Sequence, residues 1–231
     1  MIIGMIVAMP EELAGLLAEC GTPLGSKRFR GYEVLEFEIG ANTVYVAGSG
    51  AGEIAAASTT QMLISMFDVD MIINFGVVGG LTPEMGLCSA VAIEKVVHYD
   101  YDVSPFFGDG SYVPCQYPGE KSIYLKTDER LLELALASVP GLKPVICASG
   151  DKFVEGSEAK RALHDKYKAD ICEMEAAGIL ITCKRCRVPA LFIKAVSDGV
   201  DGGAKEFSTM INEAGSACVK ALMQILNSGV N

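Results

Sequence analysis

Short apolar runs of strand length alternate along the chain with segments of helix length, and this alternation most constrains the fold. Residues 2–8 form a continuous apolar run, which is typical of a strand buried on both faces. Pro10 suits the first turn of the helix that follows. The alternation predicts an α/β fold: a single domain over residues 1–231, with a central mixed, mostly parallel twisted sheet flanked by helices. Strands are predicted over 2–8, 32–39, 43–47, 71–78, 88–98, 144–149, 169–174 and 189–197, and helices over 11–20, 53–67, 128–138, 156–167, 175–186 and 206–227.

Residues 99–122 break this alternation. They are rich in Tyr, Phe, Pro, Gly and Asp and show neither helical nor strand periodicity. Long irregular segments inside compact domains are usually functional lids or contact surfaces. We therefore expect a long aromatic loop with a role in binding.

Charge and hydropathy exclude several classes of function. The chain has 29 acidic and 19 basic residues, a net charge of −10. Such a field repels nucleic-acid backbones and anionic lipid, so neither is an expected partner. No stretch reaches the roughly 18 apolar residues of a membrane span. The apolar start has no basic residue before it, unlike a secretory signal, so we expect a cytoplasmic protein.

The eight cysteines are spread through apolar segments, which predicts free buried thiols rather than a disulfide framework. Cys183 and Cys186 form a lone C-x-x-C pair, which suggests either a zinc or a redox site. Zinc would need two further ligands at motif spacing, and His98 and His164 are the only histidines. A redox pair would open a helix, whereas this pair stands near the end of one. We expect structural cysteines and no metal site, with a redox protein as an alternative.

Acidic residues follow several of the predicted strands: Glu11 and Glu12, Glu173 and Glu175, and Asp198. Ligands of open α/β folds bind at the carboxyl ends of the strands. Each acid alone has a structural interpretation, as a first-turn acid, a salt-bridge partner or a turn residue. Sharing one rim, with little positive charge expected beside them, they favour a site that protonates one group while activating another.

The glycine-rich segment 48–52 does not complete a dinucleotide fingerprint, because Glu53 stands at the third glycine position. No Gly-Lys-Ser/Thr follows a glycine-rich loop either. A close backbone approach to a small ligand is the functional interpretation that stays open.

A series of short motifs, in this order and spacing, carries a resemblance that runs nearly end to end. It includes Ile3-Gly4 through Met9 with Glu11-Glu12, Ser49-Gly50-Ala51-Gly52, Ile72-Ile73-Asn74 with Gly79-Gly80, Ser149-Gly150-Asp151 with Phe153, Glu173-Met174-Glu175-Ala176, and Ala195-Val196-Ser197-Asp198. The chain resembles the 5′-methylthioadenosine/S-adenosylhomocysteine nucleosidases of the purine nucleoside phosphorylase superfamily.

The resemblance implies roles that the spacing alone does not show. Glu12 would activate the attacking water, Asp198 would bind adenine and protonate its N7, and Glu175 with Met174 would hold the ribose. It further implies Gly79, Phe153 and Val154 as binding residues of the purine side and Ser197 as a further substrate-binding residue. Met9, Ala51 and Phe207 would lie around the 5′ substituent, and Val103 and Phe106 would reach that pocket from a neighbouring subunit. A homodimer is thus implied, with the 99–115 loop contributing to the adjacent site, a small nucleoside as substrate, and no cofactor.

For Asp198 to donate a proton near neutrality, its surroundings must disfavour the charged carboxylate. We expect a closed, net-acidic and partly apolar pocket to do so.

The nature of the nucleophile decides between two enzyme classes. Phosphorylases need a cationic cradle for phosphate, and phosphorylase relatives carry arginine where this chain has Asn74 and serine where it has Val77. Water is therefore the expected nucleophile. The chain also departs from the nucleosidase pattern at Val77, Val78 and Lys194, where Ser-Ala and arginine are common. A phosphate-dependent phosphorylase and a non-catalytic nucleoside-binding protein are the alternatives.

Overall fold

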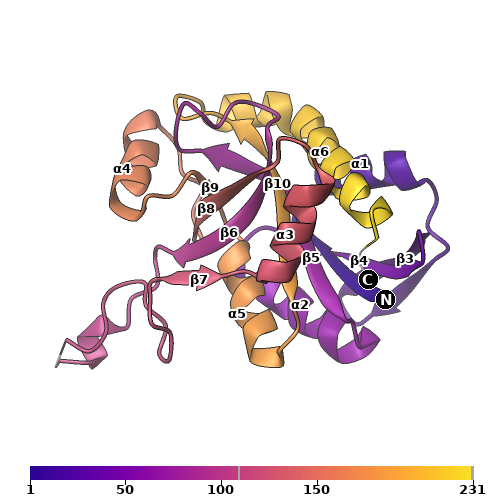
Figure 1. Cartoon of the computed structure of the whole chain (residues 1–231), viewed down its shortest axis with the longest axis horizontal. Helices are drawn as coiled ribbons and strands as arrows, with labels where there is room; N and C mark the ends of the chain where they lie inside the picture. Colours follow the sequence, from indigo (N-terminus) through magenta and orange to yellow (C-terminus); the bar gives the residue numbers. More distant parts are fainter. Residues whose placement is uncertain (109, 230–231) are drawn as a thin grey trace.

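A mixed sheet with helices on both faces forms the body of the molecule (Figure 1). The computed structural model describes residues 1–108 and 110–229, and the elements below are those of these residues. The strands are β1 (Ile2–Val7), β2 (Gly25–Phe29), β3 (Tyr32–Ile39), β4 (Asn42–Gly48), β5 (Met71–Gly80), β6 (Ala90–His98), β7 (Tyr124–Lys126), β8 (Lys143–Ser149), β9 (Ile171–Glu173) and β10 (Ala190–Asp198). The α-helices are α1 (Pro10–Cys20), α2 (Glu53–Phe67), α3 (Glu129–Ser138), α4 (Ser157–Tyr167), α5 (Ala176–Cys186) and α6 (Ala204–Asn227).

Two parallel blocks make up the sheet. Strands β4, β1, β5 and β10 pair in parallel in that order, and β6, β8 and β9 form the second block. Antiparallel pairings of β10 with β6 and of β5 with β9 join the blocks. The strands β5, β10, β6, β8 and β9 therefore close into a ring. The β2–β3–β4 meander extends the open edge. The prediction of a mixed α/β sheet is confirmed.

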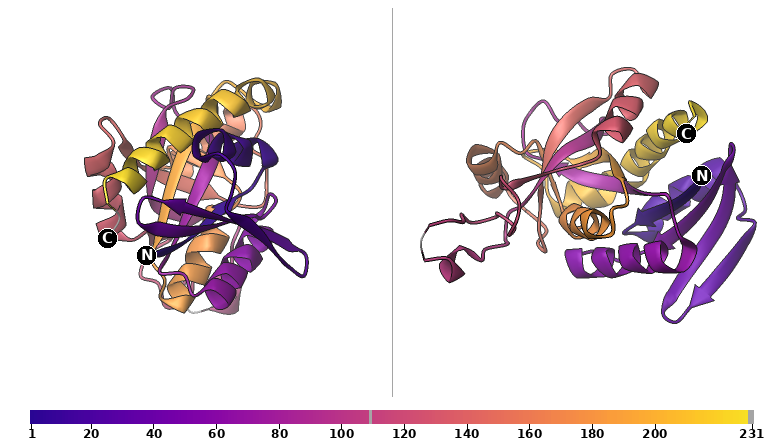
Figure 2. Two further views of the ribbon diagram at one scale, coloured as in Figure 1. Left: turned by 90° about the vertical axis from the view of Figure 1, so that its right-hand side faces the viewer. Right: turned by 60° about the horizontal axis from the view of Figure 1, so that its bottom comes forward.

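Apolar side chains fill both faces of the sheet. All nine residues of β10 are buried, as expected for a strand covered on both sides. One core cluster packs the sheet against α1, α3 and α6, and another packs it against α2 and α5 (Figures 1 and 2). This sandwich holds the strand ends, and the acids that follow them, in fixed positions.

Two of the strands, β2 and β7, are not predicted from the sequence. All five residues of β2 are exposed, so no alternation of buried and exposed positions marks it. Strand β7 has only three residues, too few to show a pattern. Residues 99–108 and 110–122 lie in the expected long loop, which contains a 3₁₀ turn at Ser104–Phe106 and extends away from the sheet (Figures 1 and 2).

The eight cysteines are free thiols. Cys183 is fully buried on α5, and burial raises its pKa, which leaves it an inert packing residue. The Cys186 thiol lies 3.4 Å from Oε1 of Gln61 on α2. Within the described residues, no helix is long and apolar enough to cross a membrane.

Candidate active site

A cavity of about 250 Å³ opens where β1, β5, β9 and β10 end. All the predicted site residues except Val103 and Phe106 line it: Met9, Glu12, Ala51, Gly79, Phe153, Val154, Met174, Glu175, Ser197, Asp198 and Phe207. The three acids that the resemblance assigns to catalysis, Glu12, Glu175 and Asp198, are far apart in the sequence, and the fold brings them to this one cavity.

Glu12 is fixed by backbone donors at the start of α1. The N–H groups of Ala8 and Met9 donate to its Oε2 at 3.1 and 2.9 Å, and that of Val77 donates to Oε1 at 2.7 Å. The side chain is 3% exposed. Burial raises the pKa of Glu12, against the opposing effects of Lys194 and of these three N–H groups. The raised pKa makes this carboxylate a stronger proton acceptor than an ordinary glutamate.

Gly76 makes room for this carboxylate, because a Cβ at that position would collide with Oε1 of Glu12.

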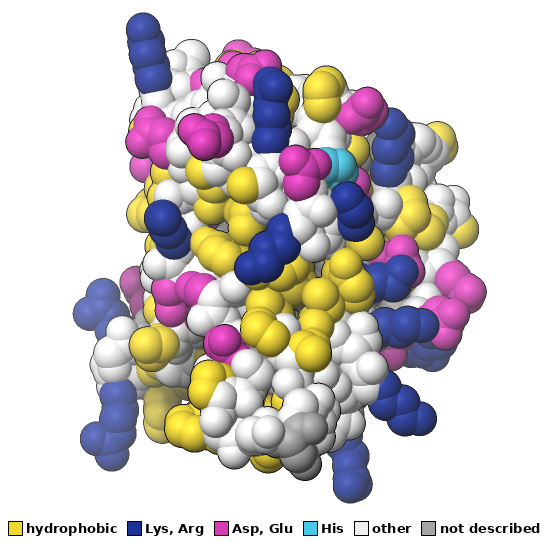
Figure 3. All heavy atoms as spheres, turned by 90° about the vertical axis from the view of Figure 1, so that its left-hand side faces the viewer, with side chains coloured by type: hydrophobic (Ala, Val, Ile, Leu, Met, Phe, Trp, Pro, Cys, Tyr) yellow, Lys and Arg dark blue, Asp and Glu magenta, His cyan; other side chains and the backbone are white. Residues whose placement is uncertain are grey.

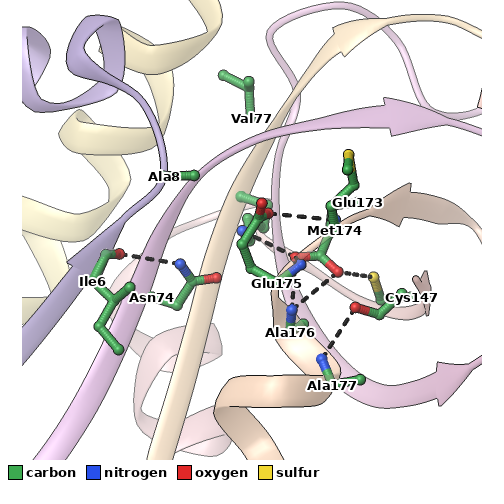
Figure 4. A network of polar contacts seen from close by, with 12 residues as sticks. Ile6, Ala8, Asn74, Val77, Cys147, Glu173, Met174, Glu175, Ala176 and Ala177 are labelled. Carbon is green, nitrogen blue, oxygen red and sulfur yellow. Dashed lines mark hydrogen bonds and ion pairs between the residues drawn. The ribbon is translucent and has the colours of Figure 1, made fainter. Parts of the chain in front are cut away.

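Glu175 stands at the start of α5, next to a second acid (Figure 4). The N–H groups of Gly52 and Met174 donate to its two carboxylate oxygens at 3.0 and 3.3 Å. Burial, followed by the neighbouring charge of Glu173, raises the pKa of Glu175 to about 7. Glu175 is thus poised between its charged and neutral forms at neutral pH.

Glu173 caps α5. Its carboxylate accepts hydrogen bonds from the N–H groups of Glu175 and Ala176, the unpaired donors of a helix start (Figure 4). Behind it, Glu53 accepts from the Ser149 hydroxyl and from the N–H of Gly178. Burial, reinforced by the charge of Glu173, raises the pKa of Glu53 to about 8, so this acid is neutral at pH 7.

The expectation of little positive charge beside these acids is wrong. Lys194, on buried strand β10, lies 3.5 Å from Glu173 and is 2% exposed. Burial alone would lower its pKa, but Glu173, Glu175 and Glu12 raise the pKa of Lys194 to about 12. A permanent cation therefore balances the cluster of glutamates from within the sheet.

A second buried lysine lies against Asp198. Lys160 of α4 is completely buried, and its Nζ is 2.5 Å from Oδ2 of Asp198. The acidic pocket expected around Asp198 therefore also contains a cation in direct contact with this residue.

One end of the cavity is apolar. Phe153 and Phe207 meet edge to face with their ring centres 5.7 Å apart. Val154 is buried beside them, and Gly79 leaves the cavity floor open. An aromatic ring facing an apolar wall suits a flat heterocycle.

Val103 and Phe106 do not line the cavity of their own chain. They belong to the protruding 99–122 loop, and Phe106 is 84% exposed. Figure 3 shows the face that carries this loop, where hydrophobic side chains gather among charged ones.

The cavity wall lacks a phosphate cradle. Among the described residues that line it, Lys152 is the basic one, and it is exposed. Asn74 donates to the carbonyl of Ile6 and does not line the cavity, whereas Val77 presents an apolar side chain to it. Neither position can grip a phosphate dianion.

Comparison with known proteins adds the family. Residues 2–227 match the model of the phosphorylase superfamily. The chain belongs to this superfamily. It is 31% identical over 232 residues to a 5′-methylthioadenosine/S-adenosylhomocysteine nucleosidase of Hydrogenovibrio crunogenus, covering 97% of each chain. It is 28% identical to an aminodeoxyfutalosine nucleosidase of Helicobacter pylori, again with 97% of each chain covered.

Solved structures of the superfamily share the fold over nearly the whole chain. The Streptococcus pneumoniae methylthioadenosine/S-adenosylhomocysteine nucleosidase bound to 8-aminoadenine superposes with a TM-score of 0.91 at 27% identity, covering 99% of this chain and 100% of the other. The native futalosine hydrolase of Helicobacter pylori gives a TM-score of 0.91 at 26% identity, covering 99% and 98%.

Three residues of this superfamily member's site were not anticipated from sequence. Lys160 lies inside a polar helix, where a charged residue predicts a solvated face. In the sequence, Glu53 is informative only because it stands at the third glycine position of an incomplete dinucleotide motif. Lys152 lies between Asp151 and Phe153, which belong to the resemblance, without being part of it. Their roles depend on packing between distant segments, which carries no local signal.

Proposed function

We propose that the chain hydrolyses the N-glycosidic bond of 5′-methylthioadenosine, S-adenosylhomocysteine and related adenine nucleosides, releasing adenine and the free thioribose. The observation that carries this proposal is the convergence of Glu12, Glu175 and Asp198 on one cavity with an aromatic wall. The nucleosidase names of its relatives support the same substrate class.

The reaction needs three forms of help, and each has a group in the cavity. Breaking the bond leaves positive charge on the sugar and negative charge on the departing base. The charged form of Glu175 would favour the cationic sugar, Asp198 would pass a proton to N7, and Glu12 would take a proton from the attacking water. Each proton-transfer group typically contributes about 10²–10⁴-fold to the rate.

The remaining wall residues would bind rather than react. Phe153 would stack on the purine and the backbone of Val154 would contact its edge. Met174 would face the ribose, while Met9 and Phe207 would surround the 5′ substituent. Ala51, Gly79 and Ser197 would complete the contact surface.

Water is the proposed nucleophile. The cavity offers an exposed lysine, Lys152, in place of the arginines that hold phosphate, and Lys194 is engaged with Glu173. Transfer to phosphate would place an unmatched dianion beside Glu12 and Glu175, which is costly in a buried site.

The test is release of adenine from several nucleosides with and without added phosphate. Methylthioadenosine, S-adenosylhomocysteine, 5′-deoxyadenosine and aminodeoxyfutalosine would cover the range of 5′ substituents. The proposal expects turnover without phosphate and a free sugar as product. Activity only with phosphate would establish a phosphorylase, and tight binding without turnover would establish a nucleoside-binding protein.

We also propose a homodimer in which Val103 and Phe106 complete the 5′ pocket of the neighbouring subunit. The large exposure of Phe106 on a protruding loop supports this, as does its absence from the lining of the cavity in its own chain. Light scattering should give twice the mass of the chain. Replacing Phe106 by Ala should raise KM for methylthioadenosine more than it changes kcat, and a monomer with unchanged KM would contradict the assignment.

We further propose that residues 1–231 form one domain that works in the cytoplasm. The eight free thiols suit a reducing compartment. One cooperative transition in urea would support a single domain, whereas two separated transitions would refute it.

A further inference from the structure

Lys160 is a buried charge that the mechanism above does not use. Helix α4 is polar, and its buried residues are Lys160 and Tyr167. Besides Asp198, the Lys160 ammonium group donates to the carbonyl oxygen of Gly199 at 2.7 Å. Lysine is almost never fully buried unless it is paired. A pairing with the residue assigned to protonate the leaving base therefore calls for a functional explanation.

Two neighbouring groups hold the Asp198 carboxylate, one at each of its oxygens. The Ser197 hydroxyl lies 2.8 Å from Oδ1, and Lys160 occupies Oδ2. The pair also borders the cavity floor, because a Cβ on Gly79 would lie 3.3 Å from Oδ2 of Asp198 and 3.6 Å from Nζ of Lys160. The two groups thus form one unit facing the purine end.

We propose that Lys160 is a positioning residue that orients Asp198 and holds the proton which Asp198 passes to N7 of the leaving adenine. This inference rests on the proposed nucleosidase function. As the C1′–N9 bond breaks, its electron pair moves into the purine. N7 takes a proton from Asp198, and Asp198 takes one from the Lys160 ammonium group. Water bonds to C1′ and gives a proton to Glu12. Solvent later takes this proton from Glu12 and returns one to Lys160.

The groups around the pair leave this proton relay intact. Cys172 on β9 faces Asp198, and burial raises the pKa of its thiol to about 12, so it adds no charge. On α6, the carboxylate of Glu206 is occupied by a hydrogen bond from the N–H of Gly199 at 2.7 Å. Arg161, next to Lys160 on α4, pairs instead with exposed Asp201 at 2.6 Å.

The mechanism predicts a pH signature. A carboxylate with its ammonium partner holds one shared proton into the alkaline range, because lysine side chains stay protonated far above neutral pH. A carboxyl group alone loses its proton earlier. Removing Lys160 should therefore cost most at high pH, where the acid that remains is empty.

The experiment compares kcat for methylthioadenosine in the wild type and in Lys160→Met across pH. The variant is expected to lose about tenfold near about pH 6.5 and more than about 100-fold near about pH 9.5, with KM changed less than about threefold. Arg161→Met is the matched control on the same helix, because its exposed ion pair contributes little. Its kcat should stay within about twofold of wild type at every pH.

Two further readouts guard against a folding defect. Asp198→Asn and the double variant with Lys160→Met should have the same kcat, because Lys160 acts only through Asp198. In the wild type, kcat should not decline with rising pH below about pH 9. A Lys160→Met loss that does not vary with pH, including complete loss at both ends, overturns the inference, as does an early alkaline decline of the wild type. A wild type without adenine release overturns the proposed function itself.

Discussion

Replacing Glu12 by Gln is the perturbation whose consequences the structure defines most fully. The carboxylate accepts three backbone hydrogen bonds, one at Oε1 and two at Oε2. An amide of the same shape can keep its oxygen toward Ala8 and Met9, but its NH₂ group then faces the N–H of Val77. One hydrogen bond to a charged group is lost, which costs about 1.5–3 kcal/mol of stability. The melting temperature should fall by about 2–4 °C for each kcal/mol.

The effect on catalysis should be larger than the effect on stability. The amide cannot take a proton from water, so kcat should fall by about 10²–10⁴-fold, or roughly 3–5 kcal/mol of activation free energy. Adenine release measured below the melting temperature of both proteins gives kcat, and calorimetry gives the stability. Glu11→Gln is the matched control, because Glu11 is the exposed neighbour on the same helical turn, and it should change neither. A Glu12→Gln variant that stays folded and keeps more than about a tenth of wild-type kcat would refute the role of Glu12.

Three other predictions concern ionisation and space in the site. The kcat should rise with pH through the neutral range, because the pKa of Glu175 lies at about 7 and that of Glu12 is also raised, so both are charged only at higher pH; a level profile from about pH 5 upward would contradict this. The fold raises the pKa of Glu53 from its ordinary value of 4.5 to about 8. The wild type should therefore lose stability as pH rises through this window, because Glu53 ionises there in the unfolded chain but stays neutral in the folded one. Urea unfolding across that window should show a smaller loss in Glu53→Gln, and an equal loss in both proteins would count against the assignment. Gly76→Ala should displace the Glu12 carboxylate and lower kcat by about 10²-fold, whereas Gly25→Ala, with open space around it, should have no effect on turnover; equal rates in the two variants would be the contrary result.

The sequence predicted those parts of the molecule that rest on local patterns. Helix α2 begins and ends at the expected residues, and the apolar runs became β1, β5 and β10. The acids of the cavity were found because each follows a strand, and parallel strands end at one rim. The resemblance then supplied roles that no spacing contains.

The parts that sequence did not predict depend on contacts between distant segments. Lys160 reaches Asp198 across 38 positions, and a lysine in a polar helix gives no sign of burial. Strand β2 forms because it pairs with β3, although its own residues are all exposed. The reach of Phe106 into another subunit stays a prediction, because it depends on an interface that one chain does not contain.

The central claim is that Glu12, Glu175 and Asp198 direct water, and not phosphate, to the anomeric carbon of an adenine nucleoside. The most direct measurement is the fate of oxygen when methylthioadenosine is turned over in heavy-oxygen water with phosphate present. The account predicts one labelled oxygen in the free thioribose for each adenine released. A sugar 1-phosphate, or a sugar that gains no label from water during turnover, would contradict it.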